Sequence, residues 1–183
     1  MPKIFTKYPR GTFPADSLDL LVEEVTTRTL AFEKLPDTPY VRSNIWIYAN
    51  EYAPERVYHG GKAGGTMVIS LEVNVMEGAL DADAKKDFIA FLTDAVGKRA
   101  GIPPQQRAPV FVLIRDVPSY NWGMFGKPVT LDGLRNPPLD PNRCRLGASP
   151  ETHVLERAHN STKLTTAKID LSPMAVANDQ MSG

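Results

Sequence analysis

The chain contains the same structural unit twice, and this repeat constrains its fold more than any other feature of the sequence. Residues 2–61 and 67–127 each show the pattern of a strand, a helix and a second strand. A helix that connects two strands of one sheet makes a right-handed crossover, so the strands within each unit are expected to run parallel. The repeat therefore predicts an α/β (α+β) fold, in which two tandem β-α-β units form a four-stranded sheet with two helices on one face.

The first unit is marked by apolar residues at helical spacing. Positions i, i+3, i+4 and i+7 are apolar, which predicts an amphipathic helix over about 15–32. Strands are expected on either side of it, at 3–8 and 44–49, where β-forming residues are frequent. The apolar positions are Leu18, Leu21, Val22 and Val25.

The second unit shows the same order with stronger patterns. A strand is expected at 67–75 and a helix at 81–99, which ends at Gly101. Residues 110–114 are all apolar, and such a run predicts a strand that is buried on both faces. Because both helices are expected on one face of the sheet, the other face needs a covering layer, and association of several copies would supply it.

Residues 128–183 have a different composition. They are polar, show little periodicity and are interrupted by prolines, which predicts an extended C-terminal arm. Ser149 followed by Pro150 is a typical helix start, so a short helix is expected at about 150–159. Residues 172–183 are expected to be disordered.

The balance of charge excludes several classes of partner. Among 183 residues, 21 Lys and Arg balance 21 Asp and Glu, so no net field attracts nucleic acid or an anionic membrane. A few local arginines can still bind a small acidic substrate. No apolar run is long enough to span a membrane, and the N-terminus lacks the apolar core of a signal peptide, so a cytoplasmic protein is expected.

The cysteine and histidine content does not predict metal chemistry. Cys144 is the only cysteine, which excludes an intrachain disulfide and a cysteine-based metal cluster. His59, His153 and His159 do not have the spacing of zinc ligands. We therefore expect no metal and no organic cofactor.

Pro2 is the residue with the most specific chemical potential. A small residue at position two usually allows removal of the initiator Met1, and the chain would then begin with a secondary amine. Ile4 and Phe5 follow it, and an apolar environment lowers the pKa of an amine because it disfavours the charged form. Such an amine can act as a general base or a nucleophile. Most Met-Pro openings have no such role, so the assignment depends on the rest of the chain.

The end of the second unit carries a family resemblance. Residues 110–127 combine an apolar strand with a Val-Pro step and an Asn-Trp-Gly step at 121–123. Together with Pro2 and the doubled unit, this pattern resembles the tautomerase superfamily over residues 2–127. Its fused, double-unit members, which include cis-3-chloroacrylic acid dehalogenase and malonate semialdehyde decarboxylase, are similar in length and layout. The resemblance implies a tautomerase/MIF-like fold, a homotrimer and an active site around Pro2.

The resemblance also implies residues that bind the substrate. Family members often carry an arginine after the first strand that holds a carboxylate or polarises a carbonyl, and Arg10 matches it. The alternative for Arg10 is a solvated turn residue. Two arginines that dehalogenase-like and decarboxylase-like members have near the start of the second unit are absent from 73–80, and their water-activating acid falls at about Met124. These differences argue against a copied dehalogenase or decarboxylase mechanism.

Another arginine, which small tautomerases carry in the second strand, is missing as well. Its positions are occupied by Trp46 and Phe111. Arg42 and Arg115 lie nearby and are candidates to replace it, although each fits an ordinary surface or interface charge. Trp46 and Trp122 are candidates for the apolar walls of a substrate pocket, and the alternative for both is a place in the core or in a subunit interface.

Three functions fit these residues. The first is a cofactor-free tautomerase, in which neutral Pro2 moves a proton between carbons of a small 2-oxo or enol carboxylic acid while Arg10 or another cation stabilises the enolate or holds the carboxylate. The second is a hydratase, dehalogenase or decarboxylase that uses the same proline on small unsaturated or 3-oxo acids. The third is a non-catalytic trimeric binding protein that kept the fold and lost the arginines. The shortage of cations in the second unit favours divergence from the known chemistry of the family.

Overall fold

The computed structural model describes residues 2–64, 67–124 and 126–137. Several features predicted from the sequence lie outside these residues, namely the helix expected at 150–159, the disorder expected at 172–183, Cys144, His153 and His159.

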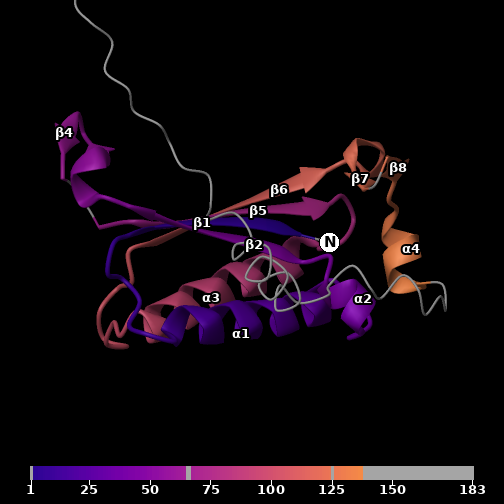
Figure 1. The fold of residues 1–183 in the computed structure, drawn as a ribbon, viewed down its shortest axis with the longest axis horizontal. Helices are drawn as coiled ribbons and strands as arrows, with labels where there is room; N and C mark the ends of the chain where they lie inside the picture. The colour runs from indigo at the N-terminus through magenta and orange to yellow at the C-terminus, as the bar shows by residue number, and fades with distance from the viewer. Residues whose placement is uncertain (1, 65–66, 125, 138–183) are drawn as a thin grey trace, which may run out of the picture. The chain divides into compact units, whose positions relative to one another are not determined.

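A four-stranded sheet forms the centre of the fold (Figure 1). Its strands lie in the order β2-β1-β5-β6, with bounds Lys3–Pro9 (β1), Trp46–Tyr52 (β2), Ile69–Met76 (β5) and Val110–Val117 (β6). β1 pairs with β2 and β5 pairs with β6 in parallel, whereas the central pair of β1 and β5 is antiparallel. The predicted sheet, with one parallel pair in each unit, is confirmed.

Two long helices cover one face of this sheet (Figure 1). α1 spans Ser17–Phe32 between β1 and β2, and α3 spans Ala82–Arg99 between β5 and β6, as the apolar stripes predict. α3 begins at an N-cap in which the carboxylate of Asp81 accepts the backbone N–H of Ala84 at 2.8 Å. No helix among the described residues is long and apolar enough to cross a membrane.

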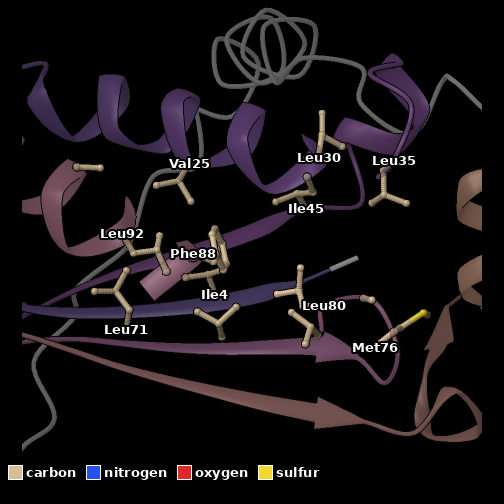
Figure 2. Close-up of a cluster of buried hydrophobic side chains, with 14 of the residues drawn as sticks. Ile4, Val25, Leu30, Leu35, Ile45, Leu71, Met76, Leu80, Phe88 and Leu92 are labelled. Carbon is tan, nitrogen blue, oxygen red and sulfur yellow. The ribbon is translucent and has the colours of Figure 1, made fainter. Parts of the chain in front are cut away.

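The core lies between the helix layer and the sheet (Figure 2). Val25 of α1 and Phe88 and Leu92 of α3 are buried together with Ile4 and Leu71 of the two central strands. Residues three or four apart on each helix thus meet alternate residues on the strands. This match between the two periodicities explains why the sequence pattern specifies the packing.

Short elements follow the second strand of each unit and extend the repeat. A 3-10 turn and a two-stranded hairpin come after β2, and the same two elements come after β6. One short helix precedes β2, and another follows the second hairpin. The bounds are Pro39–Arg42 (α2), Pro54–Arg56 (η1), Tyr58–His59 (β3), Lys62–Ala63 (β4), Ser119–Asn121 (η2), Gly123–Met124 (β7), Lys127–Pro128 (β8) and Leu131–Arg135 (α4).

The second face of the sheet is uncovered in the described chain. Along β6, Val112 and Ile114 pack against the core, whereas the side chains of Phe111 and Leu113 are 61% and 37% exposed. The prediction that this strand is buried on both faces is therefore wrong for the single chain. β6 is an edge strand whose alternate side chains point to opposite faces, so its continuous apolar run supplies the core on one side and an uncovered surface on the other.

We refer to this uncovered surface as the open face. Its side chains alternate along the strands with those that face the helices. The open face includes Trp46, Tyr48 and Asn50 of β2, Lys3, Phe5 and Lys7 of β1, Ser70, Glu72 and Asn74 of β5, and Phe111, Leu113 and Arg115 of β6.

Candidate active site

Pro2 is buried immediately before the central strand β1. Its carbonyl oxygen accepts the backbone N–H of Trp46 at 3.3 Å, which ties the start of β1 to the start of β2. Because β1 and β5 are antiparallel with Lys3 opposite Asn74, Pro2 lies at the end of the sheet where β5 and β6 finish.

A row of four side chains crosses the open face beside Pro2. The strand register places Trp46 next to Lys3, Lys3 next to Asn74, and Asn74 next to Arg115, and we refer to these four residues as the cationic row. The ammonium group of Lys3 lies 5.1 Å from the centre of the Trp46 ring, a cation–π contact. Adjacent strands are about 4.8 Å apart, so the backbone of Arg115 lies about 10 Å from that of Lys3. The fold thus brings two of the predicted site residues, Trp46 and Arg115, to the Pro2 end of the sheet.

Arg115 is held on the open face by an ion pair. Its Nη1 lies 3.0 Å from Oε2 of Glu72, and Nζ of Lys7 lies 2.9 Å from Oε1 of the same carboxylate. The hydrogen bond and charge of Lys7, followed by those of Arg115, hold the pKa of Glu72 below its ordinary value. The side chain of Arg115 is still 52% exposed, so its guanidinium retains N–H donors for a further carboxylate.

Arg10 lies at the opposite end of β1 from Pro2. Its backbone N–H donates to the carbonyl oxygen of Tyr52 at 2.9 Å, at the far ends of β1 and β2. The seven residues of β1 separate the two sites. At about 3.3 Å per residue the strand is about 23 Å long. The structure therefore does not bring Arg10 and Pro2 together within one chain.

The remaining two predicted residues have partners of their own. Arg42 ends α2, and its guanidinium pairs with Asp37 at 3.2 Å and with Glu23 of α1 at 2.5 Å, which fixes it to the helix layer. Trp122 is only 6% exposed, and its Nε1 donates to the carbonyl oxygen of Val117 at 3.2 Å. Trp122 therefore closes the end of β6, on the same end of the sheet as Pro2.

A buried acid at this end of the fold was not predicted from the sequence. Glu33 follows the last residue of α1 and is 0% exposed. Its backbone oxygen accepts Nε and Nη2 of Arg135 at 3.4 and 3.3 Å, which attaches α4 to the end of α1. The pKa of Glu33 is raised above its ordinary value, because the effect of burial exceeds the opposing effects of the chain's amino terminus, through its charge and a hydrogen bond, and of the charge of Arg135. The available signal in the sequence is a carboxylate at the negative end of a helix, where the dipole disfavours it.

Other features of the described residues do not extend this site. No three His, Cys, Asp or Glu side chains among them are grouped so that they could hold a metal ion. A groove between the end of α3 and the following loop is lined in part by Lys98, Pro103 and Arg107. This groove lies at the other end of the sheet from Pro2, because α3 runs antiparallel to β5.

Comparisons with known proteins point to one family. Residues 70–132 match a family model described as a tautomerase enzyme, and no curated protein sequence matches the chain. The chain is similar to the F6 fused 4-OT wild-type asymmetric trimer, with a TM-score of 0.57 and 20% identity over 69% of this chain and 94% of that chain. It is also similar to Pt0534 inactivated by 2-oxo-3-pentynoate, with a TM-score of 0.57 and 19% identity over 72% and 97% of the two chains.

A third similar structure is that of N1, a member of the cis-3-chloroacrylic acid dehalogenase family. Its TM-score is 0.57 and its identity is 15%, over 86% of this chain and 99% of that chain. The family match lies over β5 to α4 and includes the Asn-Trp-Gly step. The resemblance to the tautomerase superfamily that the motifs indicated is therefore confirmed, and the described chain has the fold of its fused members.

Proposed function

We propose that this chain, which has the fold of the fused tautomerases, is a cofactor-free tautomerase that uses Pro2 as general base on small 2-oxo or enol carboxylic acids. The observation that carries the proposal is the buried position of Pro2 at the start of a central strand, beside the cationic row. The tautomerase match over residues 70–132 supports this class of chemistry. We also propose a cytoplasmic location.

The proposed reaction consists of two proton transfers by one amine. Removal of Met1 frees the secondary amine of Pro2, and burial keeps this amine largely neutral. The neutral nitrogen takes a proton from the carbon next to the carbonyl group, which leaves prolinium and an enolate. Prolinium then returns the proton to a different carbon, so the amine is regenerated and no co-reactant is consumed.

The cationic row supplies substrate contacts from within the same chain. The guanidinium of Arg115 can bind a carboxylate with two parallel hydrogen bonds, and Lys3 adds a second positive charge nearer to Pro2. Trp46 on the open face and Trp122 at the end of β6 provide apolar walls. These walls exclude water, which strengthens the attraction between the cations and an enolate.

We further propose that the chain forms a homotrimer through its open face. Fused 4-OT structures with this fold are trimers. Exposed apolar side chains such as Phe111 on the open face provide the surface to be buried. In such an assembly Arg10 of one subunit can lie at Pro2 of a neighbour, which accounts for the length of β1 that separates them in one chain.

Two relatives bear on the choice of substrate. Likeness to Pt0534, a protein inactivated by 2-oxo-3-pentynoate, supports a 2-oxo acid. Likeness to N1 of the cis-3-chloroacrylic acid dehalogenase family favours the second candidate function, which is hydration, dehalogenation or decarboxylation of small unsaturated or 3-oxo acids by the same proline.

The test combines a mass measurement with a single substitution. The intact mass of the purified protein shows whether Met1 has been removed. Pro2→Ala leaves a primary amine, and we expect it to keep the fold and to lower turnover of an enolisable 2-oxo acid such as phenylpyruvate by on the order of a hundredfold or more. Pro14→Ala, at an exposed proline, is the matched control.

One outcome would favour the non-catalytic alternative. That outcome is the absence of Pro2-dependent turnover for a panel of 2-oxo acids, 2-hydroxydienoates and 3-haloacrylates, measured on protein from which Met1 is confirmed to be absent. The chain would then be better described as a trimeric binding protein.

A further inference from the structure

We propose that Glu33 is a positioning residue that sets the proton affinity of the Pro2 amine. The inference rests on the proposed role of Pro2 as general base and gives a function to a buried acid that the proton transfers themselves do not use. Three observations support the inference: the place of Glu33 in the topology, its complete burial and the charges around it.

The topology places Glu33 over the start of β1. In a β-α-β unit the connecting helix runs antiparallel to its strands, so the end of α1 returns to the beginning of β1, where Pro2 lies. Figure 1 shows the amino terminus at the end of the sheet that α2 and α4 occupy. Trp46, which binds the carbonyl oxygen of Pro2, begins β2 shortly after α1 has ended at this same end.

Apolar side chains are buried at the same end of the core as Glu33. Leu30, Leu35 and Ile45 are buried at this end of the core (Figure 2). The charged groups that act on the carboxyl group are the chain's amino terminus, which Met1 carries until it is removed, and Arg135 of α4. On its own chain segment the neighbouring Lys34 is exposed. The low dielectric of such an enclosure strengthens the interaction between the carboxylate and the amine.

Burial and the carboxylate of Glu33 shift the pKa of the Pro2 amine in opposite directions. Desolvation lowers the pKa of an amine, whereas an opposite charge within about 4–6 Å raises it by about 1–3. Removal of Met1 moves the amino group by one residue, about 3.8 Å along the chain, to Pro2, which is buried at the same end of the sheet. Glu33 therefore offsets the lowering of the amine's pKa by burial. It holds this pKa near neutral pH, where a general base is most effective.

The experiment titrates the amine without turnover. Bromopyruvate alkylates the neutral amine of Pro2, and mass analysis of the N-terminal peptide follows the rate of modification against pH. We expect Glu33→Gln to lower the midpoint of this profile by about one pH unit or more and Glu33→Asp to restore most of it. The acid limb of kcat/KM should move by the same amount. Glu24→Gln, which removes a partly exposed carboxylate of α1 that pairs with Arg99 of α3, is the matched control.

Equal midpoints in the wild-type protein and Glu33→Gln would overturn the proposal. If Glu33→Gln does not fold, a ¹³C-glutamate NMR titration of the wild-type protein decides, with the signal assigned through Glu33→Asp. The Glu33 carboxyl signal should show a step at the midpoint of the amine, and a profile without that step would also overturn the proposal. Absence of turnover would refute the proposed function alone, because the titration requires only a free amine.

Discussion

Substitution of the apolar residues on the open face of β6 should dissociate the proposed trimer and leave the subunit folded. Phe111 and Leu113 are 61% and 37% exposed in the single chain, and neither belongs to the buried core. Replacing both with glutamine therefore removes little from the packing of one subunit. The same change removes apolar surface that a neighbouring subunit would cover.

The size of the effect follows from these exposures. Taken together, the exposed parts of Phe111 and Leu113 amount to about one complete side chain, and burial of one such side chain stabilises by about 1.5–3 kcal/mol. A trimer contains three copies, so the double substitution should weaken assembly by about 5–9 kcal/mol. Since about 1.4 kcal/mol corresponds to a tenfold change, the trimerisation constant should fall by about 10³–10⁶.

Sedimentation velocity over a range of protein concentrations measures this change, and far-UV circular dichroism checks the fold. The matched control replaces Leu20 and Ile89 with glutamine, because both are exposed apolar residues on helices rather than on the open face. A wild-type protein that is monomeric at micromolar concentration would refute the reasoning. So would a control variant that dissociates as readily as the open-face variant.

Two further predictions concern the charges of the open face. If Arg115 binds the substrate carboxylate, Arg115→Ala should raise KM by about ten- to a hundredfold with little change in kcat, as expected for loss of about 1.5–3 kcal/mol of charged hydrogen bonds. Lys7→Ala, which removes the other partner of Glu72, is the control in the same steady-state assay, and equal effects of both would contradict the assignment. Because the pKa of Glu72 lies below its ordinary value of 4.5 in the folded chain, its contribution to stability is present above that value and is lost as the pH falls through the lowered pKa. Urea unfolding between pH 3 and 7 should therefore show a weaker acid dependence for Glu72→Gln than for the wild-type protein, and identical slopes would count against the ion pairs.

The arrangement of strands and helices could be predicted from the sequence because local patterns and fold agree. Apolar stripes specified both long helices, and Asp81 caps α3 where its pattern begins. The prediction for β6 was wrong because an apolar run looks the same whether its second set of side chains faces a helix or another subunit. The alternation between Phe111 outside and Val112 inside becomes visible only once the helices are placed on one face.

The candidate site was less accessible to sequence analysis because it depends on register. Trp46 and Arg115 are 69 positions apart in the sequence numbering, yet one row of backbone pairs across four strands places them on the same line. Lys3 lies in that row but carries no motif. Arg10, by contrast, can be separated from Pro2 by counting along an extended strand. Glu33 combines an unfavourable helix position with burial, and only the first of these is visible in the sequence.

The β-α-β unit occurs twice in the chain, but only the first unit carries the residue proposed as general base. β5 occupies the place in the second unit that β1 occupies in the first, yet the residue before it, Val68, lies inside the chain and has no free amine. The carbonyl oxygen of Val68 accepts the hydroxyl of Tyr52, whereas that of Pro2 accepts the backbone N–H of Trp46. The first unit ends in a link to β5, and the second continues into α4, whose Arg135 reaches back to Glu33. Pro2, Glu33 and Arg135 thus lie at one end of the sheet, and the second unit does not repeat this combination, so a trimer would hold three such sites.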